Sequence, residues 1–327
     1  MLIDRPADLG PDVLSGVLRM VRLTGALQFC MAPTGGWRTV GVTPLATLAR
    51  RPAEAIPFHV IVEGACWLDV GGRREALVAG DVVAFPTRIG HDIGAGDGRL
   101  GIDPLADLPP RPWRGTPMLA YGDGGPRARV LCGVLECDAA SFPPLVAALP
   151  PVLRARGGET GGWLGAAVAQ MAAEVDRPSA GGVSMLERLS EVVFIELLRR
   201  EIAAARPDGV GWLAALADPR LARCIGAIHA DPRRDWSVDA LAATAGMSRS
   251  GLSSRFVLVL GAPPMRYVRD WRLFLAREAL RRGGRPIAEV AWEAGYGAEA
   301  AFNRAFARAF GAPPAAWRQA AGAGAAS

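Results

Sequence analysis

The sequence contains no lysine, because all 37 of its basic residues are arginine. Without lysine the chain cannot form a Schiff base with a substrate or with pyridoxal, and it cannot complete a P-loop. It has three histidines and no GxSxG sequence, the motif of a large class of serine hydrolases. These absences remove several enzyme classes, and we do not expect the protein to be an enzyme.

Long apolar runs are missing as well. No stretch approaches the roughly 18–20 apolar residues of a membrane helix, and the N-terminus, MLIDRPADLGPD, lacks the basic and then apolar layout of a signal peptide. We therefore expect a cytoplasmic, nucleoid-associated protein without a membrane partner. The five cysteines are odd in number and follow no zinc-finger spacing, so no disulfide framework is expected. They are Cys30, Cys66, Cys132, Cys137 and Cys224.

Length and charge divide the chain. With 327 residues it is too long for one ordinary core, which favours two domains and a connector. Residues 219–318 hold 16 arginines and 8 acidic residues, whereas the remainder carries a net charge of −3. A basic C-terminal module beside a mildly acidic remainder indicates a polyanionic partner for that module.

Two kinds of hydrophobic pattern follow one another. Short β-branched or aromatic runs at 58–63, 65–70 and 81–85 are bounded by glycine or proline. They predict a barrel or sandwich over residues 1–150. Apolar residues then recur at three-to-four spacing, which predicts connector helices within residues 151–206. The apolar faces of these helices either pack within the subunit or form the seam of a homodimer.

The last hundred residues contain an internal repeat with a period of about 50 residues. LAATAGMS at 241–248 corresponds to VAWEAGYG at 290–297, and GAPP occurs at both 261–264 and 311–314. Each copy has the layout of a helix, a glycine turn and a second helix.

Two helix-turn-helix units are therefore predicted, at 237–260 and 286–310, within an all-α domain over residues 215–320. In such a unit the second helix enters a major groove of DNA, and its outward residues reach base edges. A long helix from Tyr267 to Leu280 separates the units. The two recognition helices are thus expected in successive major grooves, about 34 Å apart.

These segments resemble the DNA-binding domain of the AraC/XylS family of transcription regulators. The resemblance rests on LAATAGMSRSGLSSRF, GAPPMRYVRDWRL and IAEVAWEAGYGAEAAFNRAFARAFGAPPAAWR. It implies double-stranded DNA and RNA polymerase as partners, and a role such as transcriptional activator. The DNA-binding residues indicated by the outward faces and the resemblance are Arg249, Ser250, Ser253, Ser254, Arg255, Glu299, Ala300, Asn303, Arg304 and Arg308.

The two recognition helices differ in chemistry. The first carries three serines where family members often have larger polar side chains, which implies less base discrimination by that helix. Arginines around the helices are expected to contact phosphates, which position a protein without specifying sequence. These arginines are Arg249, Arg255, Arg272 and Arg308.

The strand-rich half is similar to the cupin-type sensor domains that precede AraC-family DNA-binding domains. The similarity lies in PFHVIVEGACWLDVGG, AGDVVAFPTRIGHDI and VLCGVLECD. Metal-binding cupins place two histidines and a carboxylate in the first motif and another histidine in the second. Here His59 and Glu63 stand in the first motif and His91 in the second, so a divalent metal such as zinc or iron is chemically feasible. The alternative is that both histidines are half-buried residues of the barrel.

A cysteine switch is a second sensing chemistry, because cytosolic thiols stay reduced until stressed. The favoured pair is Cys30, placed before the first strand, with Cys132, and some relatives of this sensor type respond to reactive species. The alternative is that each cysteine is a small buried hydrophobe. A third option is a small organic effector inside the barrel.

The sequence therefore predicts an α+β multidomain protein with a cupin-like β-barrel, a helical connector and an all-α DNA-binding domain. We expect a sequence-specific regulator of transcription that responds to a small effector or reactive species sensed by the barrel. The alternative is a cupin-type metal-dependent enzyme fused to a helical domain. The incomplete metal motif counts against that alternative.

Overall fold

The computed structural model describes residues 12–20, 23–40, 45–49, 55–113, 115–137, 148–157, 162–206 and 209–323. The chain divides into two compact units. One comprises residues 22–140 and 149–204, and the other comprises residues 1–21, 141–148 and 205–327. Each unit has its own core and is described by itself.

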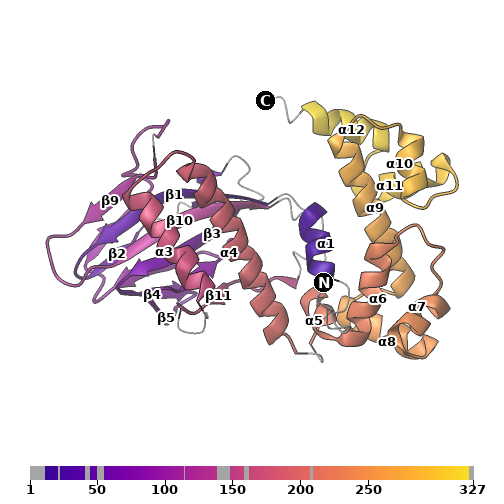
Figure 1. Ribbon diagram of the computed structural model, residues 1–327, viewed down its shortest axis with the longest axis horizontal. Helices are drawn as coiled ribbons and strands as arrows, with labels where there is room; N and C mark the ends of the chain where they lie inside the picture. Colours follow the sequence, from indigo (N-terminus) through magenta and orange to yellow (C-terminus); the bar gives the residue numbers. More distant parts are fainter. Residues whose placement is uncertain are drawn as a thin grey trace, which may run out of the picture. The chain divides into compact units, whose positions relative to one another are not determined.

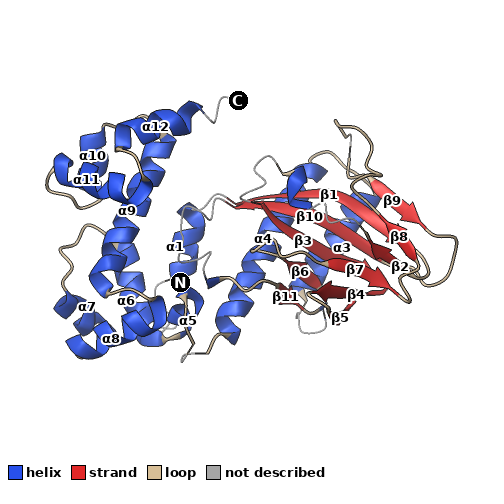
Figure 2. Ribbon diagram, turned by 180° about the vertical axis from the view of Figure 1, so that it is seen from behind, coloured by secondary structure: helices blue, strands red, loops and turns tan. Residues whose placement is uncertain are grey.

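Two sheets form the first unit (Figure 2). Their strands are β1 (Leu23–Pro33), β2 (Trp37–Thr39), β3 (Ala55–Glu63), β4 (Ala65–Val70), β5 (Arg73–Val78), β6 (Val82–Ala84), β7 (Asp92–Ala95), β8 (Leu100–Ile102), β9 (Met118–Tyr121), β10 (Arg129–Cys137) and β11 (Leu153–Ala155). The larger sheet has the order β11–β6–β3–β10–β1–β9, and the smaller has the order β5–β4–β7–β2–β8. The predicted runs correspond to β3, β4 and β6, so the predicted strand-rich N-terminal fold is confirmed.

The core between the sheets follows from the alternation of side chains along each strand. On β10, Val130, Cys132 and Val134 belong to this core, whereas Leu131 and Leu135 face the other side of the sheet. The smaller sheet contributes Trp37, Cys66, Leu68, Leu77 and Ile93, each at most 6% exposed. Full burial of one such aliphatic side chain contributes about 1.5–3 kcal/mol. These buried side chains therefore form the core between the two sheets.

Two helices, α3 (Trp163–Asp176) and α4 (Gly182–Ala204), pack on the larger sheet (Figure 1). At Gly25 of β1 an added Cβ would lie 2.5 Å from the Cβ of Ser190, so only glycine permits this approach of α4. The apolar side chains of α3 and α4 thus cover their own sheet. This corrects the expected boundary at residue 150, because the predicted connector helices belong to the N-terminal unit.

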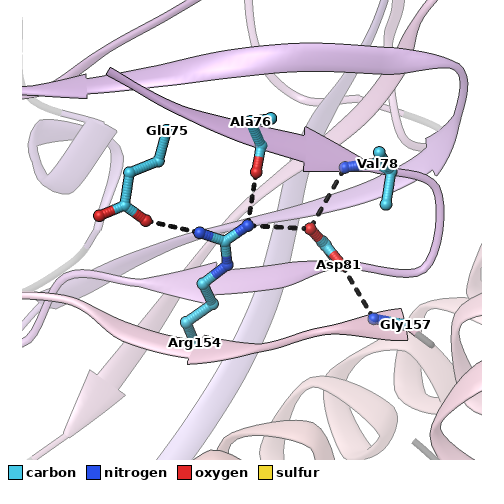
Figure 3. Close-up of polar contacts among 6 residues, drawn as sticks. All are labelled: Glu75, Ala76, Val78, Asp81, Arg154 and Gly157. Carbon is cyan, nitrogen blue, oxygen red and sulfur yellow. Dashed lines mark hydrogen bonds and ion pairs between the residues drawn. The ribbon is translucent and has the colours of Figure 1, made fainter. Parts of the chain in front are cut away.

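A buried ion pair fastens β11 to the rest of the sandwich (Figure 3). Arg154 donates from Nη1 to Glu75 at 2.6 Å and from Nη2 to Asp81 at 3.2 Å, and it also donates to the carbonyl of Ala76. Asp81, 1% exposed, accepts the backbone N–H groups of Val78 and Gly157 at 3.2 and 2.8 Å. Because every polar contact of this carboxylate lies inside the protein, it connects three segments at once.

The second unit is helical. Its helices are α1 (Val13–Met20), α5 (Trp212–Ala217), α6 (Pro219–Ala230), α7 (Val238–Ala245), α8 (Arg249–Leu260), α9 (Pro264–Arg282), α10 (Ile287–Glu293), α11 (Glu299–Phe310) and α12 (Pro314–Ala323). Both predicted helix-turn-helix units are present, as α7–α8 and α10–α11. The predicted long helix is α9, which contacts helices of both units.

The N-terminal helix α1 packs on α6, although it precedes the first strand of the sandwich. Its Val13 and Val17 are 5% and 0% exposed, and an added Cβ at Gly16 would lie 4.0 Å from Nδ1 of His229. The amphipathic spacing of Val13 and Val17, four residues apart, places both on the face that meets α6. The chain therefore crosses between the two units at its beginning as well as after α4. Across the described segments, no helix combines the length and apolar character needed to cross a bilayer.

Candidate functional site

The two helix-turn-helix units are built by the same local interactions. Gly246 ends α7 in the left-handed conformation, with φ of 64°, and Met247 then donates its N–H to the carbonyl of Ala242 at 2.9 Å. After α10, Gly295 has φ of 78°, and Tyr296 donates to the carbonyl of Ala291 at 3.0 Å. Positive φ is inexpensive only for glycine, which explains why the repeat retains a glycine at this turn.

The first recognition helix, α8, presents small residues. Leu252 and Phe256 face the core at 0% exposure, while Arg249, Ser250 and Ser254 are exposed. Ser253 is half-buried and donates its hydroxyl to the carbonyl of Arg249 at 2.9 Å. This bond uses the hydroxyl proton of Ser253 within the helix.

The second recognition helix, α11, presents larger charged groups. Phe302 and Phe306 are fully buried, whereas Arg304 and Arg308 are exposed. Asn303 is half-buried, and its Oδ1 is a buried atom with no hydrogen-bond partner in the described part of the chain. Glu299 and Ala300, in the first turn of α11, are also exposed.

Two arginines expected to contact DNA are instead engaged inside the domain. Arg255 donates from Nε to Asp218 at 3.1 Å, and its side chain is 24% exposed. Arg272 donates from Nε to the carbonyl of Pro232 at 2.6 Å and from Nη2 to that of Arg234 at 2.9 Å. Apolar spacing shows which face of a helix is outward but not which carbonyl a long side chain reaches. Both guanidinium groups therefore have partners within the domain, and DNA contact by either residue stays a prediction.

The sensor residues form a buried hydrogen-bonded chain. Cys132 and His59 are directly paired across β10 and β3, with Sγ 3.2 Å from Nδ1. Nε2 of His59 lies 2.9 Å from Nε2 of His91, and Nδ1 of His91 lies 3.1 Å from the carbonyl of Ile89. A carbonyl only accepts, so His91 carries its proton on Nδ1 and accepts at Nε2. His59 then donates from Nε2 and accepts at Nδ1, which leaves the thiol of Cys132 as the donor.

Electrostatics agrees with this proton assignment. Burial, with a smaller effect of His91, lowers the pKa of His59 well below its usual value. Burial also lowers the pKa of His91, although the Ile89 carbonyl partly opposes the shift. Burial raises the pKa of Cys132 well above its usual value. Both imidazoles are therefore neutral at neutral pH, and the thiol is protonated and unreactive.

The metal site expected at His59, Glu63 and His91 is not assembled. Glu63 ends β3, with its side chain 47% exposed and 3.8 Å from Arg127. Four residues of strand separate it from His59, which corresponds to about 13 Å. Cys132 meets the opposite nitrogen of His59 from the one that faces His91, so it cannot share a metal with both. Within the described residues no three histidine, cysteine or acidic side chains are grouped as metal ligands.

The two cysteines of the expected switch lie on opposite sides of the larger sheet. Cys30 is within β1, not before it, and pairs with Leu131, whereas Cys132 pairs with Phe29. Neighbouring positions on a strand point to opposite faces. Cys132 therefore faces the core while Cys30 faces away from it. A disulfide between them is incompatible with this register.

A cavity of about 640 Å³ opens at the edge of the sandwich. Strand β9 pairs only with Cys30 to Pro33, so the first half of β1 is left uncovered beside it. Gln28, 6% exposed, accepts from Nη2 of Arg111 at 2.7 Å, and Arg111 lies over the ring of Trp113 at 4.5 Å. The walls are completed by side chains of β10 and α4, among them Val134 and Leu186.

An exposed recognition helix in each of two linked helix-turn-helix units, on a domain with twice as many arginines as acids, defines a DNA-binding regulator. The chain matches a family described as Cupin over residues 12–203 and one described as Helix-turn-helix domain over residues 241–320. It is 30% identical over 323 residues to a Streptomyces lividans protein described as an AraC-like transcription regulator, covering 94% of this chain and 98% of that protein. It is 34% identical over 282 residues to the HTH-type transcriptional regulator AlkR of Acinetobacter baylyi, covering 81% and 88%.

The chain belongs to the AraC-like transcription regulators that carry an N-terminal cupin domain. The solved DNA-binding domain of AdpA in complex with a target DNA is 29% identical to it and covers 30% of this chain and 89% of that chain, with a TM-score of 0.29. The relatives named here are regulators, so the enzyme alternative is not favoured.

Proposed function

We propose that this protein binds duplex DNA by inserting α8 and α11 into major grooves, with α11 providing most of the base discrimination. The observation that carries the proposal is the contrast between two structurally equivalent helices. α8 exposes Ser250 and Ser254 beside Arg249, an expected phosphate contact, whereas α11 exposes Glu299 and Arg304. Arginine makes the commonest specific contact, a bidentate one to guanine, whereas a serine hydroxyl is satisfied by any of several bases.

The test is selection of bound sequences from random DNA by the full chain, followed by affinity measurements on the selected operator. Arg304→Ala should weaken binding by about 1–3 kcal/mol and relax the preference at one base pair. Arg308→Ala should weaken binding to all sequences equally. It should also lower the slope of log affinity against log salt concentration by about one counterion. Arg220→Ala, a change to an exposed arginine of α6 outside both recognition helices, is the matched control. Unchanged affinity and preference in Arg304→Ala would exclude that residue from base reading.

We further propose that the effector of the N-terminal unit is a small organic molecule bound in the edge cavity. The packed core between the sheets favours this position, as does the contribution of α4 to the cavity wall. An oxidant is the alternative signal, but it would have to reach the buried, protonated thiol of Cys132. A metal is not proposed, because Glu63 lies apart from the His59–His91 pair.

The cavity is tested by thermal denaturation of the full chain against a panel of small organic acids, amines and neutral aromatics. Compounds that raise the melting temperature should lose their effect in Ala26→Trp, which fills the cavity. They should keep it in Trp163→Ala, a change to an exposed side chain of α3. Equal responses of the two variants would place the ligand elsewhere. A DNA-binding response to peroxide that survives Cys132→Ser would exclude the oxidant mechanism at that residue.

The remaining partners follow from the proposed activity. A regulator that activates transcription contacts RNA polymerase, and it acts in the cytoplasm at the nucleoid. A homodimer is proposed on the exposed apolar residues of α4, namely Val183, Met185 and Val192, which are 64%, 47% and 45% exposed. Light scattering of the full chain, repeated with Val192→Glu, tests the dimer: a molar mass of about one chain for the parent protein would refute it.

A further inference from the structure

Beside α9, the second helix-turn-helix unit contacts the α6–α7 loop, which leads into the first unit. We propose that Arg233, Arg272 and Trp292, here called the arginine clasp, hold the two recognition helices at one fixed separation. The clasp would thereby determine which spacing between two half-sites the protein accepts. This inference rests on the proposed function and adds to it the residues that position the two reading helices.

The first contact of the clasp joins α9 to the loop between α6 and α7. Arg272 stands at the middle of α9, and its guanidinium spans two backbone carbonyls, those of Pro232 and Arg234, at 2.6 and 2.9 Å. The loop is itself ordered, because Trp236 donates to the carbonyl of Asp231 at 2.8 Å and is 4% exposed. A planar fork that spans two carbonyls fixes orientation as well as distance.

The second contact brings the turn of the other unit against the same guanidinium. A Cβ added at Gly295 would lie 3.0 Å from both Cζ and Nε of Arg272. The turn between α10 and α11 therefore rests on the side chain that the α6–α7 loop holds. Displacement of Arg272 would move both units relative to α9.

The third contact links the α6–α7 loop, which precedes the first helix-turn-helix unit, to α10 of the second unit. The guanidinium of Arg233, in the α6–α7 loop, lies 3.6 Å from the ring centre of Trp292 on α10, close enough for a cation–π interaction. The electrostatic attraction of Arg233 also contributes to the lowered pKa of Glu293, after the larger effect of Arg285. The second unit is thus held by α9, and through Arg272 and the Arg233–Trp292 stack it is also held to the loop that leads into the first unit.

Rigidity of this kind has a consequence for DNA. One added base pair moves a half-site by about 3.4 Å along the duplex and rotates it by roughly a tenth of a turn. A rigid pair of units cannot follow that change without losing one recognition helix, whereas a pair joined only by α9 has more freedom to bend. The loss of affinity when the half-site spacing changes therefore reports how rigidly the clasp holds the two units.

The experiment uses the full chain and the operator selected from random DNA, in a series with zero, one or two base pairs added or removed between the half-sites. The parent protein should lose about tenfold or more in affinity at the first change, as a mismatched base pair would cost. Arg272→Lys keeps the positive charge but removes the planar guanidinium that spans the two carbonyls. Trp292→Ala removes the aromatic ring on which Arg233 stacks. In each variant the affinity should fall by about threefold or less at the same change of spacing. Each variant should also bind the original spacing more weakly than the parent protein does.

Controls separate the clasp from general effects. Arg266→Lys, on the same helix and exposed, and Trp163→Ala, in the other unit, should keep the parent spacing profile. If Arg272→Lys proves unfolded by circular dichroism, Trp292→Ala decides alone, because its side chain is 58% exposed. If the affinity of the variants falls by the same factor at every spacing, the inference is overturned and direct phosphate contacts are indicated. A parent protein that binds all spacings equally would overturn it while leaving DNA binding intact, and a parent that selects no sequence would refute the proposed function itself.

Discussion

A single buried carboxylate illustrates how much one residue of the sandwich stabilises. Asp81 connects Arg154 of β11 with the backbone at Val78 and Gly157. Asp81→Ala leaves the arginine without its buried partner, so we expect the free energy of unfolding to fall by about 3–5 kcal/mol. Urea denaturation measures the change. Glu75→Gln is the matched control: it touches the same arginine but is 62% exposed, and a loss of more than about 1 kcal/mol there would contradict this account.

A second residue, His229, makes the stability of the helical unit depend on pH. Burial lowers the pKa of His229 to about 3, and its ring stacks on Trp271 at 3.6 Å. Below pH 6.5 the unfolded chain binds a proton that the folded chain does not, so stability falls as the pH falls. At pH 5 the loss from this residue is about 2 kcal/mol relative to neutral pH.

Urea denaturation at pH 5, 6 and 7, followed by helical ellipticity, tests that dependence. His229→Gln should flatten the decline for the helical unit, whereas His59→Gln should leave it unchanged there, because His59 lies in the sandwich. A parent protein as stable at pH 5 as at pH 7 would show that His229 is accessible to protons in the folded state.

At the scale of elements, the two recognition helices differ in how they begin. Ser248 caps α8 by accepting the N–H of Gly251 at 3.1 Å, whereas Ala298 at the same position of α11 offers no side-chain acceptor. Ser248→Ala should destabilise by about 1 kcal/mol, and Ala298→Ser should stabilise by about 0.5–1 kcal/mol. Thermal melting of both variants, compared with the parent protein, measures the two changes in stability. A fall in stability on Ala298→Ser would mean that the backbone there cannot accept a cap.

Much of the element order could be predicted from the sequence, and the reasons are local. The turn glycines Gly246 and Gly295 and the repeated GAPP string located both helix-turn-helix units, since each encodes a backbone conformation. Contacts made by long side chains over distance could not be predicted in this way. Arg255 and Arg272 were assigned to DNA because a helix pattern indicates only which face is outward. The separation of Cys30 from Cys132 required the strand register, which the run of β-forming residues does not specify.

At the scale of the whole molecule, the two compact units do not correspond to two continuous stretches of the sequence. The sequence predicted residues 1–150 as one sensor domain, yet α1 packs in the helical unit, about two hundred residues from α6 along the chain. No periodicity in eight residues reveals which distant partner an apolar face will meet. The helix α4 likewise belongs with the sandwich, where Gly25 permits its close approach, and α3 packs on α4 and β3.

The α1–α6 contact is tested by Val17→Ala. Val17 is fully buried, so losing two methyl groups should destabilise the helical unit by about 2 kcal/mol. Ser15→Ala, on the same helix and half-buried, is the control and should change stability by less than about 0.5 kcal/mol. Urea denaturation of the full chain compares the two. Equal effects would show that the contact contributes little to folding.

The docking of α1 also bears on any attempt to work with the DNA-binding half alone. A fragment cut after α4 would leave the apolar surface of α6 that normally lies beneath Val13 and Val17 open to water. Such a piece would be prone to aggregate, and a synthetic peptide spanning residues 12–20 should restore its solubility when added in trans.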